Sequence, residues 1–469
     1  MHALLLHGAS ARLDYGDPKA HLIPSCDTPP PVGSEVYAMR SLPARNITTP
    51  HPPSFYLHDQ GAHDWSDEED LHWSLSPFSQ NMCPGRAQHQ GGIYVLQALR
   101  QHWARSRDKH NASVHVSAAL MFEAGMKVFN KKGQPTSCTQ HQDETRYQDR
   151  LDALADELGA PNSTFRQGKP FIFLTASAPG EGVMFGHARL NAALRLGNPV
   201  FLTNDANYMG QDHWRKHKWD DDRVAFKQTR VLLPYLSDDY LANDPTSAGR
   251  PMEERNGVQF HGAMTSGRED DEPRTVRLDM ANVLRHLDYS RTPSDIRTEE
   301  LPQTNAADAW GEVPGQVVAT RWAMQAARIC IAPEGDTPMT RRAVDALAAG
   351  CVPLIYLDAD EDTDGKVRAM PLAHSIDWRS IALFMKASDC PARDAAWLEE
   401  QHADVDTLAA MSHRGRDAFD RFLSFGTRKR EDKDDKDALP MRMASALLEE
   451  VAIVSRPKSQ LEIVLALAD

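Results

Sequence analysis

The stretch that decides the fold is residues 328–358, which read RICIAPEGDTPMTRRAVDALAAGCVPLIYLD. An apolar run ends at Pro333, a turn of small and polar residues follows, and the spacing of apolar residues then predicts a helix as far as Ala349. Gly350 ends that helix, and a second apolar run begins at Cys351. The order strand, helix, strand is typical of a βαβ unit in a parallel sheet.

The start of this predicted helix carries cationic side chains, although the helix dipole favours carboxylates there. Arg341 and Arg342 follow Thr340, and the turn before them contains Gly335-Asp336-Thr337. Ligands of open α/β sheets bind beyond the carboxyl ends of strands, against helix N-termini. We therefore expect an anionic group to bind at this turn. The alternative is an ordinary helix start with exposed arginines.

Asp345 lies three residues after Arg342, so the two side chains are expected on one face of the helix. Its immediate neighbours are apolar, so Asp345 needs a polar partner if the helix packs on a sheet. Arg342 could supply that partner, and so could a hydroxyl-bearing ligand.

The alternation of strands and helices extends well beyond this unit. Strands are predicted at residues 113–122, 171–175, 199–203, 231–234, 258–260, 328–332 and 352–357. Helices are predicted at residues 93–106, 144–158, 187–196, 276–286, 317–327, 339–349, 395–425 and 438–454. This order indicates an α/β protein with parallel sheets that are covered on both faces.

Changes in composition predict the domain boundaries. We divide the chain into an irregular N-terminal segment (1–90), a first lobe (91–236), a polar linker (237–254), a second lobe (255–425), and a charged connector with a last helix (426–469).

The charge and hydropathy of the 469 residues exclude two classes of protein. A net charge of −14 argues against a general nucleic-acid binder, which needs a basic face to release counterions. A run of about 18 apolar residues, as a membrane span needs, is absent from the sequence. The apolar run near Met1 is also too short for the core of a signal peptide.

Two groups of residues have side chains of the kind that bind metals, but neither group is interpreted as a metal site. The six cysteines form no C-x-x-C pair, so a cysteine zinc site is not expected. Cys330 and Cys351 should lie on neighbouring strands, and we expect buried free thiols there rather than a disulfide. A second group has ligand types without a known spacing and is interpreted as a solvated segment; it comprises His58, Asp59, His63, Asp64, Glu68 and His72. No metal site is predicted.

Residues 328–358 resemble the signature of the exostosin family, glycosyltransferase family 47. The matching residues are Cys330, Pro333, Gly335 to Pro338, Thr340, Arg342, Asp345, Ala346 and Gly350 to Pro353. Weaker similarities lie upstream, where Gly262 follows an apolar strand and Arg277 falls in the next predicted helix. The resemblance covers roughly residues 90–425 and is strong only in the last third.

The resemblance implies two Rossmann-like lobes of the GT-B type that face a central cleft. It implies an inverting transfer of a sugar from a nucleotide-diphosphate donor, with a UDP-sugar expected, to a glycan or glycoprotein acceptor. No cofactor, metal or nucleic acid is expected to take part. The family also implies a place in the Golgi lumen or the secretory pathway. A non-catalytic descendant that binds nucleotides or glycans is the alternative function.

The resemblance also assigns roles to individual residues. Arg342 is expected to neutralise the diphosphate, with Arg341 as a second candidate for that role, and Asp345 is expected to accept hydrogen bonds from the ribose. Donor binding is expected at Gly262, Arg277, Gly335, Asp336, Thr337, Thr340, Arg341, Arg342 and Asp345. The catalytic base is unassigned: Glu181, Asp205 and Asp212 lie near predicted strand ends, but each alone is interpreted as a loop carboxylate.

Overall fold

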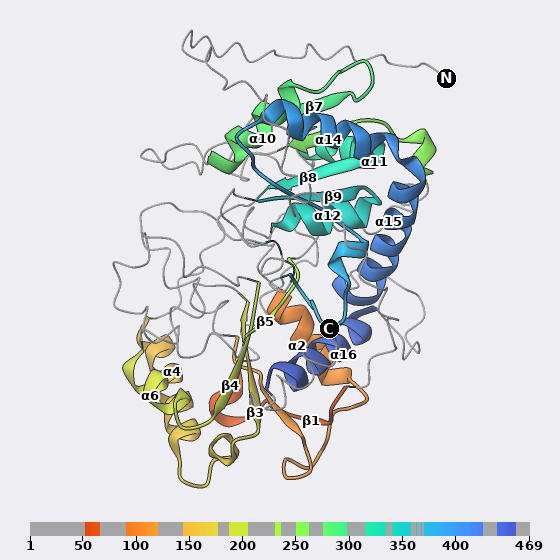
Figure 1. Ribbon diagram of the computed structural model, residues 1–469. Coiled ribbons are helices and arrows are strands. Elements are labelled where there is room, and N and C mark those ends of the chain that lie inside the picture. The colour runs from red at the N-terminus through yellow and green to blue at the C-terminus, as the bar shows by residue number, and fades with distance from the viewer. Residues whose placement is uncertain are drawn as a thin grey trace.

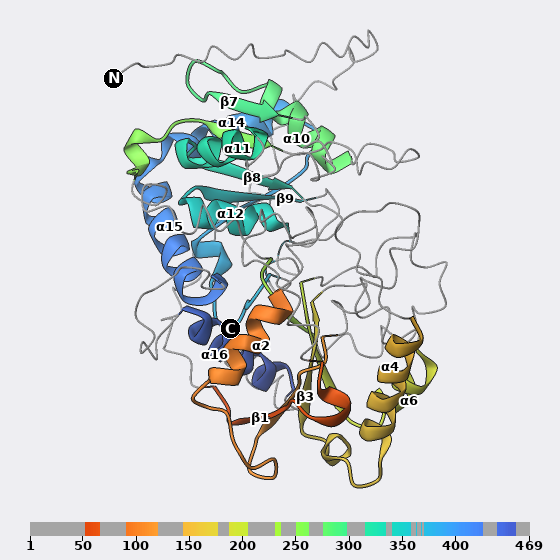
Figure 2. The same ribbon diagram turned by 180° about the vertical axis from the view of Figure 1, so that it is seen from behind.

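The computed structural model describes residues 52–65, 91–120, 144–176, 187–204, 230–235, 250–261, 275–297, 315–333, 340–357, 363, 367, 370–424 and 439–455. Within these ranges the chain forms two parallel sheets in two lobes (Figures 1 and 2). The predicted fold class, α/β with two Rossmann-like lobes, is confirmed by this topology. The described residues contain no helix long and apolar enough to cross a membrane.

The first sheet has the strand order β1-β2-β3-β4-β5. Its strands are β1 (Phe55–His58), β2 (Val114–Ser117), β3 (Pro170–Ala176), β4 (Asn198–Thr203) and β5 (Arg230–Leu232). Every neighbouring pair is parallel, with Phe171 opposite Pro199 and Leu202 opposite Val231 as examples of the register.

Both faces of this first sheet are apolar, as the continuous hydrophobic runs predict for a parallel sheet. Phe171 and Phe173 of β3 pack with α4 (Glu144–Gly159) and α6 (Ala188–Leu194) on one face. The alternate residue Ile172 packs on the other face, in a cluster that includes α2 (Gly91–Gln101) and α16 (Leu439–Val454). The last helix of the chain therefore covers the first lobe, beside α2 in both views of the ribbon.

The second sheet has the strand order β10-β9-β8-β6-β7 and is also parallel throughout. Its strands are β6 (Val258–His261), β7 (Ser294–Arg297), β8 (Ile329–Pro333), β9 (Val352–Leu357) and β10 (Leu383–Lys386). Its helices are α10 (Thr275–Arg285), α11 (Gly315–Ala326), α12 (Arg341–Ala349), α14 (Pro391–Ala403) and α15 (Val405–Ala418), the last continued by a π-helical turn η7 (Phe419–Leu423).

One boundary predicted from the sequence is wrong. Residues 1–90 are predicted to be irregular, yet β1 at Phe55–His58 is an edge strand of the first sheet, and the short 3-10 helix η1 (Gly61–His63) follows it. The strand is only four residues long and follows Pro52-Pro53, so it gives too little periodicity to be recognised. Strands β7 and β10, equally short, are absent from the predicted set for the same reason.

The interpretation of the histidine-rich segment as solvated is also wrong where the structure describes it. His63 is buried with 1% of its surface exposed, and His58 is half-buried. Asp59 pairs with Arg105 at 2.8 Å. Glu68 and His72 lie outside the described residues.

Candidate functional site

The candidate site lies at the carboxyl edge of the second sheet, where two helices begin. Strands β6 and β8 are neighbours, α10 follows β6, and α12 follows β8, so the N-termini of α10 and α12 lie at the same edge. Neither helix has an acidic residue in its first turn. Instead, Arg277 lies at the start of α10, and Arg341 and Arg342 begin α12. This edge therefore combines the positive ends of two helix dipoles with arginine side chains.

Thr340 is the N-cap residue of α12 and has an extended backbone, with φ −113° and ψ 147°. A threonine in this place normally accepts a hydrogen bond from the first turn of its helix. Its side chain makes no such bond here, and its buried Oγ1 has no hydrogen-bond partner among the described residues. The hydroxyl is thus available to a ligand at the start of the helix.

Arg342 is anchored to the end of β6. Its Nε donates a hydrogen bond to the backbone carbonyl of His261 at 2.8 Å, and its guanidinium carbon lies 5.2 Å from the centre of the Phe260 ring. The side chain is therefore half-buried and oriented, unlike the exposed arginine of an ordinary helix start. A guanidinium held in this way keeps a fixed geometry toward whatever binds at the edge.

Asp345 is nearly buried, and its carboxylate lies 3.0 Å from Nε of Arg341, one turn earlier. The spacing predicts Arg342 as the protein partner of Asp345, whereas the ion pair forms between residues i and i+4. Arg342 points instead toward β6, because Phe260 and the carbonyl of His261 hold it. The two arginines of α12 consequently have different surroundings: one faces a carboxylate and the other faces a strand end.

His261 belongs to the site but is missing from the residues predicted by sequence. Its carbonyl positions Arg342, and its buried ring lies 3.2 Å, Nδ1 to Oγ1, from Thr320 of α11. The sequence signal for His261 is its position between Phe260 and Gly262, which are part of the weaker similarity to the exostosin family.

Several predicted residues cannot be placed. They lie outside the described residues and are Gly262, Gly335, Asp336 and Thr337 for donor binding, and Glu181, Asp205 and Asp212 as carboxylates near strand ends. Arg277, Thr340, Arg341, Arg342 and Asp345 are described, and the topology brings all five to one edge of the second sheet. Their roles in binding stay predictions.

Comparison with known families bears on this edge directly. Residues 193–401 match the family model of the exostosin GT47 domain. This part of the chain is an exostosin GT47 domain. The resemblance seen in the sequence is thereby confirmed, and the matched range holds the whole of the second sheet together with β4 and β5 of the first.

Individual relatives of the exostosin domain match over short stretches. A probable glucuronosyltransferase of Oryza sativa subsp. japonica is 34% identical over 71 residues, which is 15% of this chain and 15% of that protein. Probable glucuronosyltransferase 47 A of Physcomitrium patens is 30% identical over 82 residues, which is 18% of this chain and 16% of that protein. The match thus spans about one sixth of the length of these relatives.

Among solved structures, the spinosyn forosaminyltransferase SpnP matches with a TM-score of 0.31 and 12% sequence identity. The match covers 86% of this chain and all of that one. The description of the fold therefore rests on the two sheets themselves.

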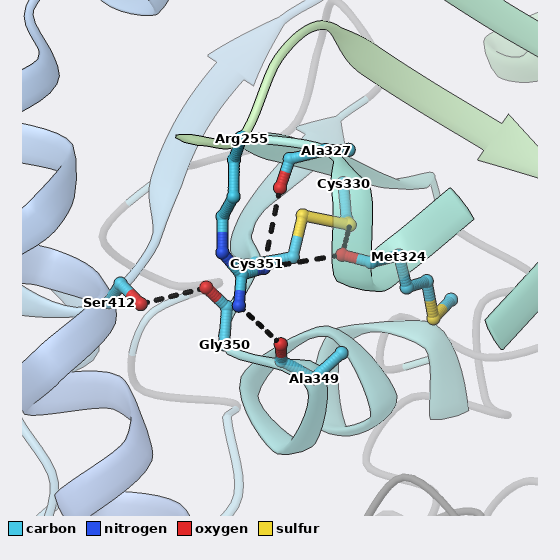
Figure 3. The surroundings of a disulfide bond; sticks show 8 residues. All are labelled: Arg255, Met324, Ala327, Cys330, Ala349, Gly350, Cys351 and Ser412. Atoms are coloured by element: carbon cyan, nitrogen blue, oxygen red, sulfur yellow. Dashed lines mark hydrogen bonds between the residues drawn. A yellow bond between two sulfur atoms is a disulfide. The ribbon is translucent and has the colours of Figure 1, made fainter. Parts of the chain in front are cut away.

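The far end of α12 in the exostosin domain is held by a disulfide and a buried arginine (Figure 3). Cys330 of β8 and Cys351 before β9 form a disulfide with a Cα–Cα distance of 5.8 Å, so the expectation of free thiols is wrong. The register of the adjacent strands, with Cys330 opposite Pro353, brings the two Cα atoms within the range that a disulfide spans. Cys390 is also disulfide-bonded.

Arg255 is only 2% exposed and lies beside this disulfide. Its guanidinium donates to the carbonyls of Ala349 at 2.9 Å and Met324 at 3.4 Å, at the C-terminal ends of α12 and α11. Burial lowers the pKa of Arg255 to about 10, so it stays charged at neutral pH. A cation here complements the negative ends of both helix dipoles.

Gly350 makes this packing possible. It has φ 72° at the C-cap of α12, and a Cβ there would come within 2.9 Å of Nη2 of Arg255. The helix that presents Arg341 and Arg342 is therefore fixed firmly at its other end.

Proposed function

We propose that this chain is an inverting glycosyltransferase that moves a sugar from a nucleotide-diphosphate donor, a UDP-sugar, to a glycan or glycoprotein acceptor. The observation that carries the proposal is the carboxyl edge of the second sheet inside the exostosin domain. There Arg342 is oriented by β6, Arg341 and Arg277 lie at helix starts, and the hydroxyl of Thr340 has no partner among the described residues. Such an edge suits a ligand with several anionic oxygens.

In this proposal Arg342 binds the diphosphate. Its Nε donates to the carbonyl of His261, which orients the guanidinium, and a planar guanidinium suits phosphate oxygens. The hydroxyl of Thr340 and the N–H groups of the first turn of α12 add neutral donors. Stabilising the negative charge on the departing diphosphate lowers the barrier to transfer.

Asp345 is proposed to accept hydrogen bonds from the ribose. Its carboxylate lies 3.0 Å from Nε of Arg341 near the start of α12, and an ionised carboxylate accepts hydrogen bonds of the kind that ribose hydroxyls donate. A nucleotide would then lie along the start of α12, with the ribose near Asp345 and the phosphates near Arg342. The transfer needs no metal in this arrangement, because arginines and helix N-termini take the role of the cation.

The acceptor is proposed to bind on the side of the first lobe, which supplies a carboxylate as the base that deprotonates its hydroxyl. The Cys330–Cys351 disulfide supports work in an oxidising compartment such as the Golgi lumen or another part of the secretory pathway. No nucleic-acid partner is proposed for a chain with a net charge of −14.

The test is a panel of UDP- and GDP-sugars offered to the full chain together with oligosaccharide acceptors. Binding is followed by calorimetry and turnover by release of the free nucleotide. We expect UDP to bind and one UDP-sugar to support transfer. Binding of UDP without transfer to any acceptor would favour the non-catalytic alternative, and absence of nucleotide binding would contradict both functions.

A further inference from the structure

Three metal-binding side chains from three different elements meet in the first lobe. His58 ends β1, His63 ends η1, and Glu157 lies in the last turn of α4. One ring nitrogen of each histidine and one carboxylate oxygen all lie within 4.8 Å of one another. Residues 58 and 157 are far apart in sequence, so this meeting is a product of the fold.

One pair of these atoms has nearly the spacing of two ligands around one ion. Nε2 of His63 lies 3.6 Å from Oε1 of Glu157, which is too long for a hydrogen bond. Two ligands of a tetrahedral zinc ion, each about 2.0 to 2.1 Å from the metal, lie roughly 3.4 Å apart. A small movement of a half-exposed glutamate is enough to reach that geometry.

The other polar atoms of the three side chains are held by the protein. His63 contacts the hydroxyl of Ser117 through Nδ1 at 2.8 Å, and His58 contacts Nδ1 of His115 through Nε2 at 3.0 Å. The N–H of Ala62 donates to Oε2 of Glu157 at 3.3 Å. Histidine ligands of metals use their second nitrogen in this way, which fixes the tautomer and the orientation of the ring.

Access to the group is also suitable for an ion. The side chain of His63 is 2% exposed, whereas that of Glu157 is 46% exposed. The carboxylate therefore opens the group to solvent on one side, where a water molecule can complete the coordination. Two imidazoles with one carboxylate and an open position form a donor set that zinc accepts, while calcium and magnesium prefer oxygen donors.

We propose that His58, His63 and Glu157 bind a zinc ion that ties β1 and η1 to α4 in the first lobe. The site is separate from the arginine edge of the second sheet, and it contributes to stability whether or not the proposed transfer activity is correct. Ser117, His115 and Ala62 orient the three ligands and do not touch the ion.

The experiment uses the full chain without a histidine tag, because a tag would add zinc-binding imidazoles to the 20 histidines of the sequence. Zinc affinity is measured by competition with a chromophoric chelator, and the melting temperature is measured with zinc and with EDTA. Glu157→Gln is the main variant, since its amide oxygen can still accept the N–H of Ala62 and its exposed position tolerates the change. Glu399→Gln is the matched control, because that glutamate likewise accepts a backbone N–H, from Asp288 at 2.5 Å.

We expect the parent chain to bind one zinc ion and to melt several degrees higher with zinc at a hundredfold excess over the dissociation constant. Glu157→Gln should weaken this binding by on the order of 10² and abolish the rise in melting temperature, while Glu399→Gln should leave both unchanged. A tetrahedral ligand-field spectrum with cobalt should be lost in Glu157→Gln and in His63→Gln. Equal zinc affinity in the parent chain and in folded Glu157→Gln would overturn the proposal, as would absence of zinc-dependent stabilisation.

Discussion

Each sheet gathers polar side chains at the ends of some of its strands, and the two groups have opposite charge preferences. At the first sheet, β1 and β2 end at His58 and Ser117, and the residues gathered there are imidazoles and a carboxylate. Burial lowers the pKa of His63 to about 4, so its ring is neutral at pH 7. At the second sheet, helices that follow β6 and β8 begin with arginines and contain no acidic residue in the first turn.

The comparison teaches that the side chains gathered at strand ends, rather than the parallel sheet itself, decide what kind of ligand binds. Neutral imidazole lone pairs with a carboxylate attract a cation, whereas guanidinium groups with free helix N–H groups attract an anion. The two edges should therefore respond to different perturbations.

The largest effect is expected from removing the oriented cation of the second edge. Arg342→Ala should lower kcat/KM for transfer by on the order of 10², since a charge-assisted contact to the leaving diphosphate is lost. Some stability should also be lost, about 1 kcal/mol, because the bond to the carbonyl of His261 disappears. Arg285→Ala, at the opposite end of α10, is the control and should be near neutral. A variant of Arg342 that is destabilised yet keeps its UDP affinity would show that this arginine is structural.

A smaller effect is expected at the carboxylate of the same edge. Asp345→Asn should weaken binding of UDP and UDP-sugar alike by on the order of 10-fold, because both ligands carry the ribose. The unliganded protein should lose less than about 1 kcal/mol, because an ion pair between residues i and i+4 of one helix contributes little. Asp417→Asn, which breaks a similar i to i+4 pair with Arg421, serves as the control. Unchanged UDP affinity in calorimetry would remove Asp345 from the donor site.

The next prediction concerns the pH dependence of stability, through a buried histidine that lies outside the proposed zinc site. His402 in the second lobe accepts the N–H of Gly257 through Nε2 at 2.9 Å, and burial lowers its pKa from 6.5 to about 4. Between pH 6.5 and pH 4 the unfolded chain binds a proton at His402 that the folded chain does not bind. The contribution of His402 to the stability of the folded chain is therefore complete above pH 6.5 and falls as the pH drops toward 4. Denaturant unfolding at pH 7 and pH 5 should show about 1 kcal/mol less acid loss in His402→Gln. An equal loss in both proteins would mean that His402 has the same pKa in the folded and the unfolded chain, and would contradict the prediction.

The smallest effect is expected from chelation during transfer. Brief treatment with EDTA, well below the melting temperature, should change the initial rate by less than about twofold, since arginines and helix N-termini stabilise the leaving group in the proposal. Loss of activity that Mn²⁺ restores would contradict a metal-free transfer. It would also remove the contrast between the cation-binding group of the first lobe and the anion-binding group of the second.

The second lobe was the part most accessible to prediction from sequence. Long apolar runs and a strong helix period place β8, α12 and β9 within two residues of their observed bounds. The signature residues also predict correctly that the start of α12 lies at a sheet edge. Which arginine pairs with Asp345 could not be predicted, because the choice depends on Phe260 and His261, which come from a strand 80 residues earlier.

The first lobe shows where such prediction stops. The four residues of β1 have no period that a sequence alone can distinguish, and the meeting of His58 with Glu157 depends on the packing of α4 against η1. The expectation of free thiols at Cys330 and Cys351 is wrong for a different reason. Neighbouring strands were foreseen for Cys330 and Cys351, but the distance that decides between thiols and a bond is a matter of register.

Because α16 packs on the first lobe, the unit that folds together extends beyond the residues that match the family model. Residues 193–401 include β4 and β5 but exclude β1 to β3 and the helix that covers them. In the intact chain Ser445 of α16 contacts His102 at 2.9 Å, and Glu450 accepts the N–H groups of His374 and Ser375. A recombinant fragment cut at the limits of the family match would keep β4 and β5 without β1 to β3, and would also lack α15 and η7. Any fragment that omits residues 439–455 should therefore aggregate.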